Sequence, residues 1–304
     1  MARAAAALAL VVAVAGCAGG AARPQRGATV RPTDRTSRLR VIRIGSLPRA
    51  MAKAAAVALP GGRLMILGGY AGGASLAAIL AGPPGRLRPV GQLPQPTHDA
   101  AAALLGGSVY LFGGGEASSW PNVVRVDPVS GAAIRAPALD EPLSDLGAVA
   151  IGGHAYLVGG YTGTQYASAV LRYLRQGGTT TVARLPSGTR YAGVAALGRT
   201  IYVAGGLTTA GPSRAVYAVT PATGAVRRVA TLPAPEAHAA LAALAGRLYL
   251  VGGRRVLELD PRSGTVRVAA RLPVSLSDPT ATALRGRIVV AGGGSDGVWL
   301  LTRS

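Results

Sequence analysis

Short apolar runs alternate with turn residues along most of the chain. The run at 239–245 is followed by a Gly-Arg turn and a second run, 248–251, which ends in Gly252-Gly253. Runs of about four to seven apolar residues bounded by Gly or Asp-Pro predict β-strands joined as hairpins. No segment after residue 38 has the period of an amphipathic helix, so the pattern predicts an all-β domain.

Two markers repeat along this domain with a common period. Gly-Gly pairs end an apolar run, with their first glycines at 68, 113, 159, 205, 252 and 292. Leu-Pro pairs at 47, 93, 185, 232 and 272 keep the same phase, and Leu139-Asp-Glu-Pro142 fills the missing position. Repeats of this length with four short strands each are typical of β-propeller blades. The sequence therefore predicts a six-bladed β-propeller of four-stranded blades.

The two ends of the domain complement each other. The last repeat stops after a third strand at 298–302, whereas residues 39–47 have the pattern of a fourth strand with no repeat of its own. We expect this N-terminal strand to complete the last blade, because that pairing closes the ring and removes two open sheet edges.

The repeats resemble kelch repeats over about residues 40 to 304. The similarity lies in Val109-Tyr-Leu-Phe-Gly-Gly114, Ala155-Tyr-Leu-Val-Gly-Gly160 and Ile201-Tyr-Val-Ala-Gly-Gly206. The tryptophan that kelch repeats usually carry before the fourth strand is absent, which weakens assignment to any kelch subfamily. The resemblance implies kelch-type blades and a role in binding or scaffolding, which is common among kelch propellers.

The N-terminus has the pattern of a bacterial export signal. Arg3 precedes the apolar run 4–13, and Val14-Ala15-Gly16-Cys17 resembles a lipobox. The resemblance implies a signal peptide at 1–16 and a diacylglycerol (palmitate-bearing) anchor on Cys17. The following residues lack apolar periodicity and contain Gly, Pro, Thr and Arg, so we expect a flexible tether at 17–37 before the propeller at 38–304. It predicts a lipoprotein held on the membrane outside the cytoplasm, at the cell surface. The alternative is an ordinary cleaved signal with an incidental cysteine.

The composition limits the kinds of partner and cofactor that the protein can bind. The chain has 32 basic and 12 acidic residues but only 4% aromatic residues, so stacking partners for nucleic acid are few. We expect no nucleic-acid partner; the basic surface suits anionic lipid or a cell-envelope polymer better.

Cys17 is the only cysteine, which excludes a disulfide framework, a thiolate metal site and the cysteine-dependent chemistry of kelch copper radical oxidases. We expect a monomer without metal or cofactor.

One literal motif fails in context. Residues 292–297 read G-x-G-x-x-G and also contain the G-x-S-x-G of a nucleophile elbow. Both chemistries need a helix directly after the motif, and here a short strand follows. We interpret the segment as a turn.

One polar cluster remains. In a propeller, the loops that lead into the innermost strands open on one face around the central channel. Positions 14 residues before each first glycine are Ala54, Asp99, Asp145, Tyr191, His238 and Asp278, and those 15 before are Lys53, His98, Ser144, Arg190, Ala237 and Ser277. We expect one of these rings to face the channel. The candidate ligand-binding residues are Lys53, His98, Asp99, Asp145, Arg190, Tyr191, His238 and Asp278.

These residues leave two functions open. The first is a non-enzymatic binding or interaction module whose protein, polymer or sugar partner is unspecified. The alternative is a carbohydrate-active enzyme, similar to the six-bladed kelch epimerases that act on sialic acid. Its proton-transfer pair would be His238 with Asp278 or Arg190 with Glu116, while Asp99 with Asp145 would suit hydrolysis. A structural explanation also stands, because strand starts on a propeller face are often simply solvated.

Overall fold

A computed structural model describes residues 39–303. The expected signal peptide (1–16), the tether (17–37) and the lipid-bearing Cys17 lie outside the described residues, as does the last residue of the chain. Within 39–303 the regular elements are β-strands apart from two short 3-10 turns, η1 (Pro60–Gly62) and η2 (Pro84–Arg86). The prediction of an all-β domain is confirmed. No helix in this range has the length and apolar character needed to cross a membrane.

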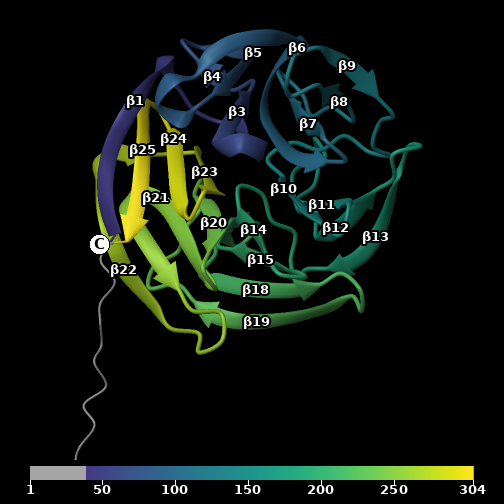
Figure 1. Cartoon of the computed structure of the whole chain (residues 1–304). Helices are drawn as coiled ribbons and strands as arrows, with labels where there is room; N and C mark the ends of the chain where they lie inside the picture. The colour runs from purple at the N-terminus through teal and green to yellow at the C-terminus, as the bar shows by residue number, and fades with distance from the viewer. Residues whose placement is uncertain (1–38, 304) are drawn as a thin grey trace, which may run out of the picture. The chain divides into compact units, whose positions relative to one another are not determined.

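The strands form small antiparallel sheets in a propeller-like arrangement around a central channel (Figure 1). Two four-stranded sheets consist of β10 (Gly147–Ile151), β11 (His154–Val158), β12 (Ala169–Tyr173) and β13 (Thr179–Arg184), and of β14 (Gly193–Leu197), β15 (Thr200–Ala204), β18 (Ala215–Thr220) and β19 (Ala225–Thr231). A third consists of β23 (Pro279–Leu284), β24 (Arg287–Gly292), β25 (Ser295–Arg303) and β1 (Leu39–Met51).

The remaining strands include two that are unusually long. β6 (Arg88–Leu105) pairs with β5 (Ala74–Gly82) through its first half and with β7 (Ser108–Gly115) through its second, so it joins two successive sheets. The other strands of this pair of sheets are β2 (Ala55–Leu59), β3 (Arg63–Leu67), β8 (Val123–Val126) and β9 (Ala133–Ala136). Two-residue strands at β4 (Tyr70–Ala71), β16 (Leu207–Thr208) and β17 (Gly211–Pro212) lie in connections.

The second long strand differs from the sequence prediction. β21 (Arg247–Leu259) pairs with β20 (Ala240–Leu244) and then with β22 (Val266–Leu276), and it runs without a break through Arg254 and Arg255. The repeat pattern predicts a strand that ends at Gly252-Gly253. A register shift between Gly253 and Arg255 explains the difference, because a bulge lets the chain bend while it stays in the ladder.

The two ends of the domain meet in one sheet. β1 pairs antiparallel with β25, with Leu39 opposite Arg303 and Ser46 opposite Gly297. This is the pairing that we expected for residues 39–47. The buried side chains of Leu39 and Trp299 pack with Val256 of β21, so the core lies between neighbouring sheets.

The repeated glycines hold neighbouring sheets together. The N–H of Gly114 donates to the carbonyl of Leu143 at 2.8 Å, and the N–H of Gly160 donates to the carbonyl of Thr189 at the same distance. A Cβ on Gly113 would lie 2.0 Å from the Leu143 oxygen, so only glycine allows this approach. Each such bond ties the end of one strand to the loop that leads into the next sheet, and these loops carry the candidate site.

Candidate functional site

Six residues form a closed backbone ring, five of them just before an innermost strand and Asp99 within β6, where its pairing with β7 begins. All six have left-handed backbone, with φ between 53° and 58°, although none is glycine. The N–H of each donates to the carbonyl of the previous member at 2.7–3.1 Å, and Lys53 closes the circle by donating to Asp278. The members of this ring, which we call the mouth ring, are Lys53, Asp99, Asp145, Tyr191, His238 and Asp278.

The mouth ring differs from the sequence prediction in the first repeat. Counting 14 residues back from the first glycine selected Ala54 in the first repeat, but Lys53 occupies the ring. The first repeat has a three-residue turn at Pro60–Gly62 where the second has two residues between Leu105 and Ser108. The extra residue shifts the count by one.

The residues just before the mouth-ring residues do not bond to one another around the channel; their backbones pair with other segments. Arg190 forms an isolated bridge with Leu207, and His98 pairs with Gly115 of β7. Their backbones thus bind the connections that follow the second strands rather than lining the channel. The cavity at the mouth is lined by all six ring residues and by neither His98 nor Arg190.

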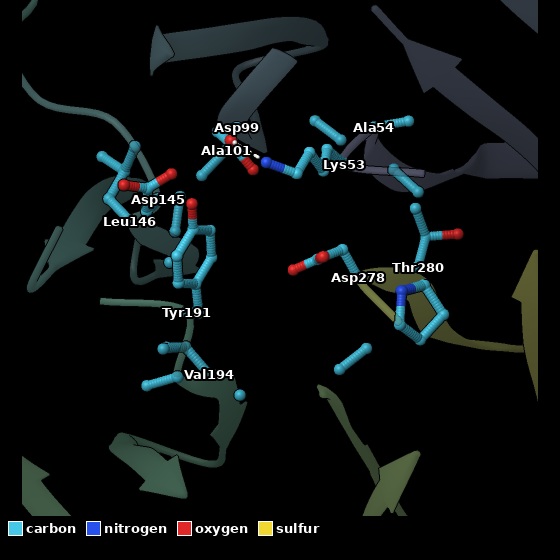
Figure 2. A pocket seen from close by; sticks show the side chains of 18 of the residues that line it. Lys53, Ala54, Asp99, Ala101, Asp145, Leu146, Tyr191, Val194, Asp278 and Thr280 are labelled. Carbon is cyan, nitrogen blue, oxygen red and sulfur yellow. Dashed lines mark hydrogen bonds and ion pairs between the residues drawn. The ribbon is translucent and has the colours of Figure 1, made fainter. Parts of the chain in front are cut away.

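The cavity measures ≈180 Å³ and lies where the channel opens. Figure 2 shows Lys53, Asp99, Asp145, Tyr191 and Asp278 directed into a common space. Deeper in the channel the side chains of the innermost strands are mostly alanine, and a second opening of ≈400 Å³ is lined by residues such as Ala58, Ala150 and Ala196. The polar side chains are therefore concentrated at one end.

Each mouth carboxylate is paired. Lys53 Nζ lies 2.9 Å from Asp99 Oδ2, and Arg190 Nη2 lies 2.6 Å from Asp145 Oδ2. His238 Nδ1 lies 2.7 Å from Asp278 Oδ1. Although Arg190 does not line the cavity, its side chain thus contacts a carboxylate that does. His98 does so more weakly, with Nε2 at 3.6 Å from Asp99 Oδ2.

The neighbouring carboxyl groups of Asp99 and Asp145 both have raised pKa values. Burial is the main reason that the pKa of Asp145 is raised to about 6. The negative charge of the adjacent Asp99 raises this pKa further, whereas the positive charge of Arg190 lowers it. Burial also raises the pKa of Asp99, against the lowering effect of Lys53. The two carboxyl groups affect each other's ionisation, because two adjacent carboxylates favour holding one proton between them.

Arg190 is held by aromatic side chains. Its guanidinium lies 4.5 Å from the ring centroid of Tyr191, 4.6 Å from that of Tyr161 and 5.5 Å from that of Tyr166. Its Nη2 also donates to the Tyr191 hydroxyl at 2.7 Å. Tyr161 and Tyr166 do not line the cavity, but both contact the guanidinium that pairs with Asp145. Arg190 is paired with Asp145 rather than with Glu116, the partner suggested for proton transfer.

Other contacts were not visible in the sequence. The Tyr191 ring lies 4.0 Å from the His238 ring, and the hydroxyls of Ser144 and Ser277 each donate to the following aspartate at 3.1 Å. Asp296 pairs with Arg43 outside the cavity. Across residues 39–303, no group of three or more His, Cys, Asp or Glu side chains is arranged to hold a metal ion.

Comparisons with known proteins bear on the fold. No family model matches the chain, and no curated protein matches it. The solved structure of YjhT is similar, with a TM-score of 0.72 and 13% sequence identity over 85% of this chain and 95% of that one. At this identity the likeness supports the propeller fold alone. The chain is thus a β-propeller with a paired acidic cluster at one end of its channel.

The Asp145 carboxyl should make stability fall as pH rises. Its folded-state pKa of about 6 exceeds the usual 3.8, so the folded state binds the proton more tightly than the unfolded state does. The stabilising contribution is present below about pH 4 and is lost by about pH 7, an effect of roughly 2–3 kcal/mol. Chemical denaturation across this range should show a larger loss in the wild type than in Asp145→Asn, in which only the raised pKa of Asp99 contributes.

Asp127→Asn is the matched control. Backbone and side-chain hydrogen bonds from Ser130 hold the pKa of Asp127 below its usual value. Its carboxylate therefore stabilises the fold above the unfolded pKa and loses that contribution in acid, which is the opposite sense. Equal pH profiles for wild type and Asp145→Asn would contradict the assignment.

Proposed function

We propose that the chain is a six-bladed, kelch-type propeller. Six mouth-ring residues with the same backbone conformation support this count, since each starts one innermost strand. On this interpretation β6 contributes to two blades, β21 supplies two strands of one blade, and β1 completes the last blade beside β25. The kelch assignment rests on the Gly-Gly and Tyr-containing repeats and on the likeness to YjhT.

We further propose that the channel mouth binds a small polar ligand, a sugar, and that the propeller serves as a binding module. The observation that carries this is the set of paired carboxylates directed into one ≈180 Å³ cavity. Carboxylate oxygens accept hydrogen bonds from hydroxyls, and Lys53 supplies a donor. The Tyr191 ring adds a flat apolar surface against which a sugar ring can pack.

Binding should be detectable as a rise in melting temperature of the full-length protein. A ligand at about a hundred times its Kd stabilises the folded state by about 2.7 kcal/mol. A panel of neutral and acidic monosaccharides should include at least one that gives this shift. Tyr191→Asn should abolish it, because asparagine tolerates the left-handed backbone but lacks the aromatic ring. Asp127→Asn should retain it; no shift with any sugar would contradict the proposal.

We propose that the protein is anchored outside the cytoplasm through a lipid on Cys17. The support is the sequence alone: the apolar run 4–13 and the lipobox-like residues that end at the single cysteine. Acyl chains would hold the protein at a membrane by burying CH₂ groups. Expressed in bacteria, the wild type should incorporate labelled palmitate and partition into detergent. Cys17→Ser should do neither, and an unlabelled wild type would contradict the proposal.

A second candidate function is sugar mutarotation, which the His238–Asp278 contact favours. A carboxylate at 2.7 Å from Nδ1 orients the imidazole. His238 would take the proton of the anomeric hydroxyl while a protonated carboxyl of the Asp99–Asp145 pair protonates the ring oxygen. The anomeric carbon–ring oxygen bond then breaks, and closure on the other carbonyl face gives the second anomer, with both protons returned.

Anomer exchange measured by NMR distinguishes this enzyme from a simple binding module. The wild type should accelerate exchange of a sugar that it binds. His238→Asn should lower the rate by about a hundredfold or more, while the melting temperature is unchanged. A sugar that binds with no acceleration of exchange leaves the binding module as the function.

A further inference from the structure

The charges at the mouth determine whether a neutral or an anionic sugar fits there. This inference rests on the sugar-binding function proposed above. The mouth has two permanent cations, and each already contacts a carboxylate. Lys53 Nζ is 2.9 Å from Asp99, and Arg190 Nη2 is 2.6 Å from Asp145. Both pairs are shielded, since the Asp99 and Asp145 side chains are 9% and 1% exposed.

The two histidines add no unengaged positive charge. His238 Nδ1 contacts Asp278 at 2.7 Å, so any proton that it gains is matched by a third carboxylate. His98 Nδ1 is bonded to the Ser75 hydroxyl at 2.8 Å, and burial lowers the pKa of its imidazole, which favours the neutral form. With all three carboxylates ionised and both histidines neutral, the mouth has three negative charges against two positive ones.

Nearby arginines do not change this balance. Arg255 contacts Glu236 at 2.5 Å, and Arg254 donates to the carbonyl of Pro273 at 2.8 Å. Neither lines the cavity. Among the described residues that line the mouth or contact its lining side chains, each cation therefore has a carboxylate partner at hand.

We infer that the mouth accepts an uncharged sugar and rejects the same sugar when it bears a carboxylate. An anionic group would enter a site whose net charge is negative or, with a proton shared between Asp99 and Asp145, close to zero. It would have to compete with Asp99 for Lys53 or with Asp145 for Arg190, and the displaced carboxylate would remain buried without its partner. Hydroxyl groups meet no such penalty, because they donate to the carboxylates as these stand.

In the charge of its ligand, the chain differs from the sugar-acid epimerases that its repeats resemble. Sialic acid carries a carboxylate, and recognition of a carboxylate requires a cation that is free to pair with it. The resemblance in fold therefore does not extend to the charge of the ligand.

Matched sugar pairs test the inference on the full-length protein. Glucose and glucuronate differ only in oxidation at C6, as do galactose and galacturonate, and N-acetylneuraminate is added as the sugar acid that the resemblance suggests. Calorimetric titration should give a Kd for at least one neutral sugar, with its uronate weaker by about tenfold or more at low salt. The discrimination should shrink as salt is raised.

Asp99→Asn is the decisive variant, since it removes one negative charge and releases Lys53. Asparagine adopts left-handed backbone readily, so the mouth ring should persist and the melting temperature should stay within a few degrees. Affinity for the uronate should rise relative to that for the neutral sugar. Asp296→Asn is the control, because it releases Arg43 outside the cavity and should leave the ratio unchanged.

The outcomes separate the two proposals. A uronate or N-acetylneuraminate that binds the wild type as tightly as a neutral sugar overturns the charge selectivity and leaves sugar binding in place. An unchanged ratio in Asp99→Asn, with folding intact, also overturns it. Absence of binding by every sugar in the panel removes the proposed function, and the inference with it.

Discussion

Six peptide groups form a closed circle of hydrogen bonds around one end of the channel, and the rest of the site depends on it. Each N–H in the circle is satisfied by the carbonyl of the previous member, at 2.7–3.1 Å. The geometry requires left-handed backbone at all six positions, which costs roughly 1–2 kcal/mol for an ordinary L-residue. Because a single member cannot leave without breaking two bonds, the ring fixes where six side chains begin.

The glycine repeats transmit this order between the sheets. In four of the pairs the second glycine donates to the loop before the next innermost strand, as Gly114 does to Leu143 and Gly160 to Thr189. Each sheet thus positions the mouth-ring residue of its neighbour, Asp145 and Tyr191 in these two cases. The period of the glycines along the chain and the spacing of side chains around the mouth therefore have the same physical origin.

The mouth combines this backbone constraint with its chemistry. Aspartate and histidine are among the few residue types that tolerate left-handed backbone, so four of the six ring residues suit the geometry by themselves. Lys53 and Tyr191 do not, and both make contacts that offset the cost: Lys53 with Asp99, and Tyr191 with Arg190 and His238. Pairing also keeps three aspartates together at the mouth without a large net charge, which is why we expect a neutral ligand there.

The repeat pattern was enough to predict an all-β, propeller-like chain, because turn glycines and short apolar runs are local signals whose spacing does not depend on distant contacts. The same pattern placed Asp99, Asp145, Tyr191, His238 and Asp278 at equivalent positions. It misassigned the first repeat, where an added residue in the Pro60–Gly62 turn moved Lys53 into the ring. It could not show that Arg190 pairs with Asp145, that the Tyr191 ring contacts His238, or that the Asp99 carboxylate raises the pKa of Asp145. These contacts join residues from different sheets, so only closure of the ring in three dimensions brings them together.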